Sequence, residues 1–257
     1  MFPLQPGEKV TVVLPLTGAF RSFPADHYIF MGTALGTVKK TSLDEFSNPR
    51  KAGIIAVDLD EGDHLIGAAL TDGQHDVMLF SDSGKAVRFD ENDVRPMGRN
   101  ARGVRGMNLE EGQNVIAMLV AEQDETQAAE PVSVLCATEN GYGKRTSIVE
   151  YTRHGRGTKG MIAIQQTERN GRVVAATLVR PADEIMLITD RGVLVRTRVS
   201  EIRELGRATQ GVTLIALDDG TKLSGLQRIV ENDAQVDHPA DNGDDNDNPG
   251  TADEENA

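Results

Sequence analysis

Residues 77–94 read VMLFSDSGKAVRFDENDV, and this stretch indicates how the chain folds. The apolar run Val77–Phe80 leads into a polar turn that ends at Gly84, and a second run follows with Arg88 in its middle. Short apolar runs joined by a glycine turn are typical of antiparallel strands, because glycine supplies the positive φ that a tight turn requires. The stretch therefore predicts a β-hairpin.

The same pattern occurs four times along the chain. The turn glycines are Gly36, Gly84, Gly141 and Gly192. Ser or Thr stands three residues before each glycine, Lys or Arg four residues after it, and Asp or Glu nine residues after it. The glycines are 48, 57 and 51 residues apart, so the sequence is a tandem array of similar units.

Two further segments complete each unit. A second glycine (Gly53, Gly106, Gly160 or Gly211) opens a third apolar run, and an acidic or Asn-Gly turn leads into a fourth. Four strands in a unit of this length are typical of a propeller blade. We predict an all-β, propeller-like fold with four complete repeats at about 27–71, 76–121, 132–180 and 184–230. Residues 1–20 are predicted to be the end of a preceding blade, with a last strand at Val10–Leu16.

The charge is divided unevenly along the chain. The formal net charge is −13, but residues 231–257 hold ten of the forty acidic residues and no Lys or Arg. This segment has almost no apolar residues and is predicted to be a disordered acidic tail. The rest of the chain has 27 basic and 30 acidic residues, so a basic surface there requires local clustering.

Composition also limits the cellular context. The single cysteine, Cys136, lies in an apolar run and is expected to be a buried core residue; one cysteine fits a reducing compartment. No apolar run approaches the length of a membrane helix, and the first residues lack the pattern of a signal peptide. We therefore predict a cytoplasmic protein with no membrane partner.

Two loops have nearly the same sequence. Residues 102–106 read RGVRG and residues 156–160 read RGTKG, and both precede the third run of their unit. Arginine offers paired donors to phosphate oxygens, and glycine lets the backbone approach closely, so such loops suit sequence-independent DNA binding. We predict DNA contact for the basic residues of these loops and of their counterparts: Arg50, Lys51, Arg99, Arg102, Arg105, Arg153, Arg156, Lys159 and Arg207.

The basic residue four positions after each turn glycine has two interpretations. These residues are Lys40, Arg88, Arg145 and Arg196, and each has an acidic residue five positions further on. The repeated pair is consistent with a salt bridge that staples the blade, and the repeated cation is equally consistent with DNA contact. Both roles stay open, and the four residues are included among the candidate DNA-binding residues.

Four segments carry a family resemblance: GTVKKT at 36–41, GYGKRT at 141–146, RTRVSEI at 196–202 and GLQR at 225–228. From about residue 2 to 230 the chain resembles the C-terminal domain of bacterial DNA gyrase A. The resemblance implies a β-pinwheel, in which blades exchange hairpins with their neighbours and DNA wraps around a basic edge. The loops RGVRG and RGTKG resemble degenerate copies of the seven-residue basic box of that family, which this chain does not contain.

The resemblance also implies a role within a larger enzyme. The chain is expected to be a DNA-wrapping part of gyrase A that lacks the N-terminal region and is not catalytic alone. Its expected partners are double-stranded DNA, the rest of gyrase A, and gyrase B in an A2B2 holoenzyme, where ATP and Mg²⁺ act outside this chain. The alternatives are the related domain of topoisomerase IV and a protein-binding propeller.

Other chemistries find little support in the sequence. Tyr28, Tyr142 and Tyr151 fall inside the repeats and match no part of a DNA-cleavage domain. The five histidines are scattered and, with one cysteine, give no zinc-ligand spacing. We therefore predict no catalytic residue, no metal site and no cofactor in this chain.

Overall fold

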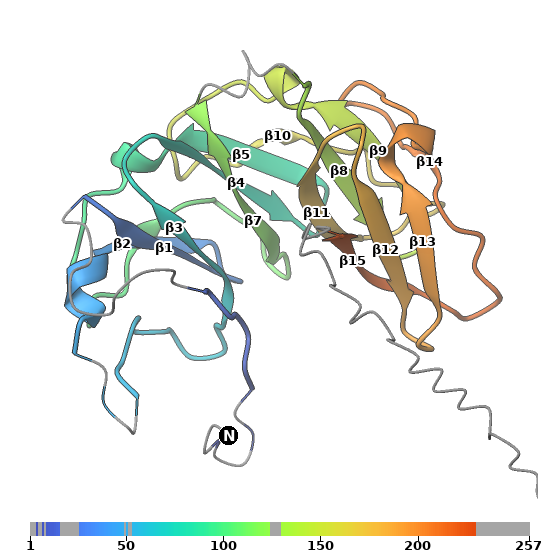
Figure 1. The fold of residues 1–257 in the computed structure, drawn as a ribbon. Coiled ribbons are helices and arrows are strands. Elements are labelled where there is room, and N and C mark those ends of the chain that lie inside the picture. Colours follow the sequence, from blue (N-terminus) through green and yellow to red (C-terminus); the bar gives the residue numbers. More distant parts are fainter. Residues whose placement is uncertain are drawn as a thin grey trace, which may run out of the picture.

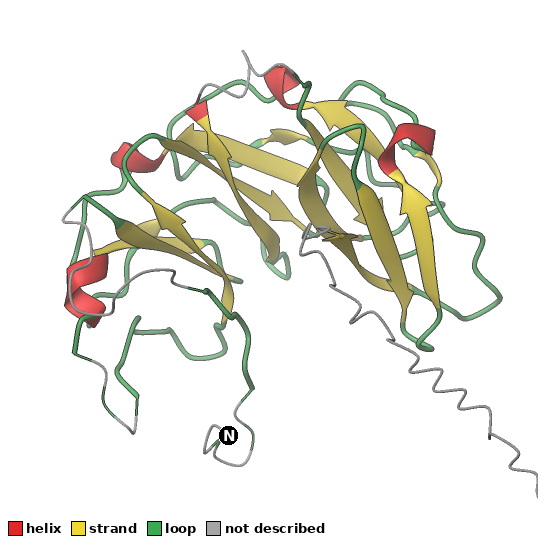
Figure 2. Cartoon of the chain, viewed as in Figure 1, coloured by secondary structure: helices red, strands yellow, loops and turns green. Residues whose placement is uncertain are grey.

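The computed structural model describes residues 4, 7, 9–15, 26–48, 50, 53–123 and 130–229. Within these residues the chain forms antiparallel sheets that follow one another along an arc (Figure 1). The only helices described are single 3-10 turns between strands (Figure 2). The predicted all-β, propeller-like fold is therefore confirmed. No helix among these residues has the length and apolar character needed to span a membrane.

Each repeat begins with a hairpin. The first repeat contains β1 (Tyr28–Thr33), β2 (Thr37–Ser42), η1 (Leu43–Phe46) and β3 (Leu65–Thr71). The second contains β4 (His75–Ser81), β5 (Lys85–Asp90), η2 (Glu91–Asp93), β6 (Val104–Arg105) and β7 (Val115–Glu122). The third contains β8 (Ser133–Thr138), β9 (Tyr142–Ser147), η4 (Ile148–Glu150), β10 (Met161–Ile162) and β11 (Val173–Val179). The fourth contains β12 (Glu184–Thr189), β13 (Leu194–Arg198), η5 (Val199–Glu201), β14 (Val212–Thr213) and β15 (Leu223–Ile229).

The third strand of a repeat pairs with the sheet of the repeat before it. The sheet orders are β3-β1-β2-β6, β10-β5-β4-β7, β11-β8-β9-β14 and β13-β12-β15. Thus β6, β10 and β14 are donated strands, and each lies at the edge of the preceding blade. The last sheet has three strands among the described residues. An exchange between neighbouring blades, which the family resemblance implies, is present, and the exchanged element is a single short strand of each donating repeat.

The turn glycines behave as their spacing predicts. Gly36, Gly84, Gly141 and Gly192 all have φ between 78° and 84°, a region that other residues enter only at a cost. The glycine before the third strand of the second repeat is Gly103, with φ 115°, and not Gly106 as predicted. Both glycines lie in RGVRG, and only the backbone angle distinguishes them.

The core lies between the sheets, because both faces of the middle blades are covered. In β4, Val77 and Leu79 pack with Phe30 and Val38 of the first blade. The alternate residues of the same strand, Met78 and Phe80, pack with residues of the third blade that include Cys136, which is buried as expected. A strand that is buried on both faces has apolar residues at successive positions, which explains the sequence VMLF.

Two predicted strands are absent from the described residues. The described part of the predicted strand Val10–Leu16, residues 10–15, has no strand pairing, and Leu16 lies outside the described residues. The third run of the first repeat, after Gly53, is also unpaired. A strand forms only where a partner edge is available, and no preceding sheet is described that could accept either segment. The predicted acidic tail, 231–257, lies outside the described residues.

Candidate nucleic-acid interface

The basic loops run along the outer side of the arc. The fourth strands of the repeats, β3, β7, β11 and β15, contact one another in succession on the inner side (Figure 1). The donated strands β6, β10 and β14 lie at the opposite edge of their sheets, and the basic loops lead directly into them. The exchange of strands therefore repeats the same loop at successive positions along one edge.

One arginine anchors each of three loops by the same contact. The Nη1 atoms of Arg99, Arg156 and Arg207 donate hydrogen bonds to the backbone oxygens of Ile55, Arg105 and Ile162, each at 3.0 Å. Each acceptor is the second residue after the glycine that opens the third run of the preceding repeat. The three arginines stand fifteen residues after their turn glycines, and Lys51, at the same offset in the first repeat, lies outside the described residues.

Two buried lysines bind the backbone of the basic loops through their ammonium groups. Lys39 Nζ donates hydrogen bonds to the backbone oxygens of Ala56, at 2.6 Å, and Arg99. Lys144 Nζ donates to the backbone oxygen of Gly206 at 2.5 Å, to that of Arg207, and to Thr209 Oγ1 at 3.1 Å. Both ammonium groups therefore fix the backbone of a basic loop, and burial lowers the pKa of each lysine, to about 8 for Lys144.

The lowered pKa of Lys144 gives a pH-dependent contribution to stability with a definite sign. Between about pH 8 and the ordinary lysine pKa, the unfolded chain binds a proton at this residue that the folded chain does not. The free energy of unfolding should therefore rise with pH in this window, by at most about 1.4 kcal/mol per unit from this group. Denaturant unfolding at pH 8 and pH 10 should show a smaller rise for Lys144→Met than for the unsubstituted chain. Equal rises would contradict the assignment.

Lys40 and Arg88 are buried at the interfaces between repeats. Lys40 is 1% exposed, and its Nζ lies 2.8 Å from Glu91 Oε2 of the next repeat. Arg88 is 5% exposed, pairs through Nε with Asp76 at 2.7 Å, and donates to the backbone oxygen of Ile148 at 3.0 Å. Their burial corrects the predicted DNA contact for these two residues, because neither side chain can reach a phosphate.

Arg145 and Arg196 have the same structural position but are less covered. Arg145 Nε donates to the backbone oxygen of Ile202 in the next repeat at 2.7 Å, and its Nη1 lies 3.8 Å from Glu204. Arg196 pairs with Glu184 across its own hairpin and is exposed. The four aligned cations therefore form stabilising ion pairs, as one of the two interpretations predicted. The predicted partner, the acidic residue five positions further on, is wrong. The observed acids lie across the hairpin or in the next repeat.

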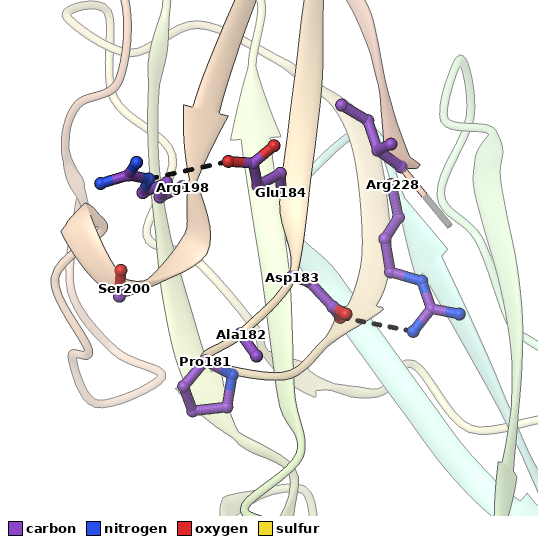
Figure 3. Close-up of a pocket in the computed structure, with 8 residues that line it drawn as sticks. Pro181, Ala182, Asp183, Glu184, Arg198, Ser200 and Arg228 are labelled. Carbon is purple, nitrogen blue, oxygen red and sulfur yellow. Dashed lines mark hydrogen bonds and ion pairs between the residues drawn. The ribbon is translucent and has the colours of Figure 1, made fainter. Parts of the chain in front are cut away.

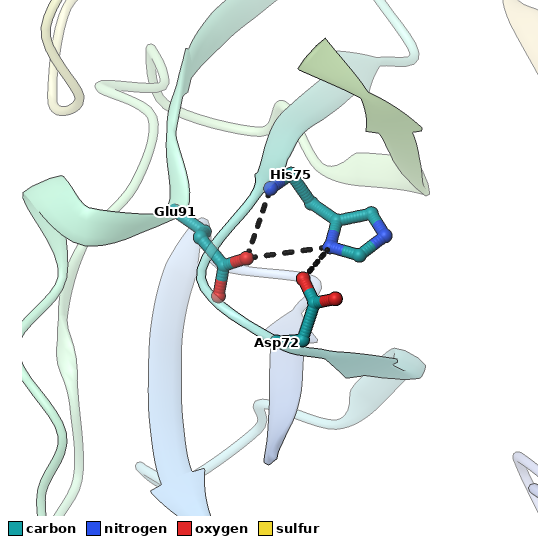
Figure 4. A group of neighbouring side chains, drawn as sticks. All are labelled: Asp72, His75 and Glu91. Carbon is teal, nitrogen blue, oxygen red and sulfur yellow. Dashed lines mark hydrogen bonds and ion pairs between the residues drawn. The ribbon is translucent and has the colours of Figure 1, made fainter. Parts of the chain in front are cut away.

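Glu91 forms the centre of a polar group between the first two repeats (Figure 4). Its Oε1 accepts hydrogen bonds from the backbone N–H groups of Gly73 and His75, at 2.8 and 3.0 Å. His75 Nδ1 lies 3.0 Å from Asp72 Oδ1 and 3.4 Å from Glu91 Oε1. Asp72, His75 and Glu91 are the described residues placed closely enough to hold a metal ion. Because the Lys40 ammonium already faces the Glu91 carboxylate, we interpret this group as a structural contact that joins the first two repeats.

Several predicted loop residues are exposed but paired with acids. Arg102 lies 3.1 Å from Asp58 and 2.7 Å from Asp60. Lys159 lies 3.2 Å from Glu110. These pairs are exposed on both sides, so each contributes little to stability and can open for a phosphate. Arg153 differs, because it lies 2.6 Å from the buried Asp76, which also binds Arg88.

Four further exposed arginines have no hydrogen bond or ion pair to another side chain in the described part of the chain. Arg50 and Arg105 belong to the predicted set, and Arg105 lies on the donated strand β6. Arg95 and Arg203 are also exposed and without such a partner, and they were not predicted from the sequence. Both stand eleven residues after a turn glycine, so extending the repeat alignment by one column would have found them.

Each of the three tyrosines packs against a cation or another aromatic ring. Tyr28 lies under the Lys40 ammonium, 4.3 Å from it, and Tyr142 lies 4.7 Å from the Arg169 guanidinium. Tyr151 is buried and packs edge-to-face against Phe80, with ring centroids 5.8 Å apart. Burial raises the pKa of Tyr151 far above its ordinary value, so this hydroxyl is a poor source of a nucleophilic oxygen.

A pocket of about 580 Å³ lies at the end of the last sheet (Figure 3). Its charged lining residues pair with one another: Asp183 lies 3.3 Å from Arg228, and Glu184 lies 3.7 Å from Arg198. Arg228 comes from β15, and Asp183 comes from the turn before β12. We find no arrangement of a nucleophile and a base among its lining residues.

Comparison with known proteins identifies the repeats. A sequence model of the family described as "DNA gyrase C-terminal domain, beta-propeller" matches residues 27–72, 75–122, 133–180 and 183–229. The chain belongs to this family. The DNA gyrase A protein of Pseudomonas aeruginosa is 52% identical over 225 residues, which cover 88% of this chain and 23% of that protein. The DNA gyrase A protein of Escherichia coli is 50% identical over 231 residues, covering 90% and 25%.

Solved structures of the gyrase A C-terminal domain and its relatives share the fold. One described as the structure of a DNA gyrase A C-terminal domain has a TM-score of 0.70 at 28% identity, covering 81% of this chain and 68% of that chain. The crystal structure of a topoisomerase IV C-terminal domain has a TM-score of 0.79 at 24% identity, covering 89% and 68%. The chain spans about a quarter of the length of the curated gyrase A relatives given above.

Proposed function

We propose that this chain binds duplex DNA along the outer edge of its arc and bends it there. The observation that carries the proposal is the repeated anchor, in which Arg99, Arg156 and Arg207 each bind a backbone oxygen at 3.0 Å on the preceding repeat. The anchor places loops of the same kind at successive blades. A duplex that follows the edge meets cations at intervals along its backbone, without reading bases.

The exposed cations supply the phosphate contacts in this proposal. Arg105 lies on a donated strand, and Arg95 and Arg203 lie between a 3-10 turn and a basic loop. Each anchored arginine uses Nη1 to bind a backbone oxygen, and Arg156 also uses Nε to bind the Asp93 oxygen, so each guanidinium keeps other N–H groups for a phosphate. Bending a duplex of 20–30 base pairs by 40–90° costs of order 1–6 kcal/mol, so contacts must be spread over several blades to offset it.

We further propose that this binding serves negative supercoiling by a gyrase holoenzyme. The support is the family and the similarity to DNA gyrase A proteins. In this proposal the chain is not catalytic alone, gyrase A and gyrase B form an A2B2 assembly in the cytoplasm, and ATP and Mg²⁺ act outside the chain. Its part is to present a bent duplex to the strand-passage site.

The experiment that tests the proposal measures binding and wrapping together. The chain is titrated onto a duplex of about 150 base pairs, close to one persistence length, over a salt series. Nicked circles are then ligated in its presence and their linking number is read. Salt-dependent binding with a shift in linking number is expected. Binding without the shift would overturn the wrapping step, and no binding at low salt would favour a protein-binding propeller instead.

Two variants that lose the same charge should show whether DNA binding depends on the outer edge or only on the net charge of the chain. Arg95, Arg105 and Arg203 changed together to serine should reduce the slope of log affinity against log salt by about 2–3, because each lost phosphate contact contributes about 0.9. The control changes Arg180, Lys222 and Arg228 to serine and removes the same charge at or beside the inner strands β11 and β15. Equal losses in the two variants would mean that only net charge matters.

A further inference from the structure

The basic loop of the third repeat differs from its neighbours in the side chain that faces it. The strand after each turn glycine faces the basic loop of the next repeat through the third residue after that glycine. In β2 and β9 this residue is Lys39 or Lys144, and its ammonium binds the backbone of the loop. In β5 it is Val87, which lines a hollow of about 360 Å³ together with residues of the loop 154–160. The third loop therefore has an apolar side chain where the second and fourth loops have an ammonium.

The loops of the third and fourth repeats share their sequence and their backbone contacts. Residues 155–158 read GRGT and residues 206–209 read GRAT, at the same distance from their turn glycines. The arginine of each loop makes the anchor contact at 3.0 Å. The threonine backbone oxygen of each loop accepts a hydrogen bond at 2.9 Å from an N–H group of the preceding repeat. The two loops therefore hold their oxygen atoms in equivalent places.

The oxygen atoms that bind Lys144 have counterparts of the same residue types in the third repeat. Lys144 Nζ donates to the backbone oxygens of Gly206 and Arg207 and to Thr209 Oγ1. The counterparts are the backbone oxygens of Gly155 and Arg156 and Oγ1 of Thr158. Within the described residues these three oxygens accept no hydrogen bond. The third loop thus presents a set of oxygens that binds a cation in the fourth loop.

The charges around the two loops are also alike. Glu150 and Arg207 both act by charge on the Lys144 ammonium. Their counterparts at the third loop are Asp93 and Arg156, and Arg156 Nε donates to the Asp93 backbone oxygen at 3.0 Å. An arginine beside the oxygens therefore does not prevent a cation from binding. No carboxylate is among the described residues that line the hollow, so its oxygens are neutral and suit a singly charged ion better than Ca²⁺ or Mg²⁺.

We propose that a potassium ion binds in this hollow, in the position that the Lys144 ammonium has at the fourth loop. Backbone carbonyl oxygens can replace the hydration shell of K⁺, which resembles an ammonium in size and charge. The protein ligands are the three oxygens of Gly155, Arg156 and Thr158, and water completes the shell. The ion fixes the backbone of the loop that carries Arg156 and Lys159. The proposal does not rest on DNA binding, and its test contains no DNA.

The test measures amide hydrogen exchange of the full chain by mass spectrometry in potassium, ammonium or choline chloride at equal ionic strength. Peptides that cover 154–160 should exchange more slowly in potassium or ammonium than in choline, by a factor of 1 + [K⁺]/Kd, which is about tenfold at about 150 mM for a Kd of about 15 mM. Peptides that cover 98–102 and 206–209 are internal controls and should not respond, because lysines bind these loops. Equal exchange of 154–160 in the three salts, or equal slowing of all three loops, would overturn the proposal.

Two substitutions should exchange the behaviour of the two loops. Lys144→Val gives β9 the side chain of β5, so exchange of 206–209 should become dependent on K⁺. Val87→Lys gives β5 an ammonium, so exchange of 154–160 should be slow in choline chloride and independent of K⁺. Circular dichroism shows whether each variant is folded, and the unsubstituted chain with Lys144→Val still tests the site if Val87→Lys is not. A folded Lys144→Val chain whose loop 206–209 exchanges equally in potassium and choline chloride would overturn the proposal.

Discussion

Gly84→Ala is expected to destabilise the chain far more than Gly192→Ala, although the two glycines have φ values of 78° and 80°. The backbone strain of a non-glycine residue in this region is roughly 1–2 kcal/mol at both positions. At Gly84 the new Cβ would also lie 2.4 Å from the Ile164 oxygen, so the donated strand β10 and its neighbours must move away. At Gly192 no atom lies within 4 Å.

The difference between the two variants isolates the strand exchange. Loss of the hydrogen bonds that dock the donated segment on Gly84 should cost about 2–4 kcal/mol beyond the strain, at about 0.5–1.5 kcal/mol for each bond and with loss of packing. Denaturant midpoints of the two variants, measured side by side at a concentration where the chain is monomeric, give the comparison. Equal midpoints would show that the donated strand contributes nothing to stability.

Lys40→Met is expected to have the second large effect. The substitution keeps the volume of the side chain but leaves the Glu91 carboxylate buried without its ammonium partner. Breaking one side of a buried ion pair costs about 3–5 kcal/mol. Denaturant unfolding at pH 7 should show a loss of this size. Lys40→Met combined with Glu91→Gln should recover part of it, and a double variant that adds the two losses would contradict the pairing.

The pH dependence of the Lys40→Met loss has a definite sign. Burial by itself would raise the pKa of Glu91, but the hydrogen bond and the charge of Lys40 outweigh burial and hold this pKa below its ordinary value. The contribution of the pair is therefore present above the pKa of an unfolded glutamate, about 4.3, and is lost as the pH falls through the lower folded pKa. The loss caused by Lys40→Met should shrink in the same acidic range, since Glu91 then becomes neutral.

The repeat and its turns were predictable from the sequence because they depend on local backbone requirements. Gly36 and its three counterparts have a positive φ that other residues adopt only with strain, so the spacing of these glycines indicates where the tight turns of the fold lie. The loop arginines were found for a similar reason, because RGVRG and RGTKG repeat a composition. Arg95 and Arg203 were missed because their column has Ser or Thr in the other two repeats.

The partners of the aligned cations were not predictable from spacing along the chain. Arg88 meets Asp76 across its hairpin and the backbone of Ile148 in the next repeat, and both contacts depend on how sheets stack. Val87 and Lys144 occupy the same column, yet only the lysine holds a basic loop. Sequence distance also could not show that the third strand joins the previous sheet, because pairing within or between blades leaves the same periodicity.

The strand exchange has a consequence during synthesis on the ribosome. In the first sheet Thr37 pairs with Arg105, so the sheet cannot be completed until 68 further residues have been translated. At about 5–20 residues per second this delay is roughly 3–14 s, and the same wait recurs for each later blade. The nascent chain therefore always carries one unfinished edge, which closes when the next repeat emerges, so assembly proceeds in order from the N-terminal end.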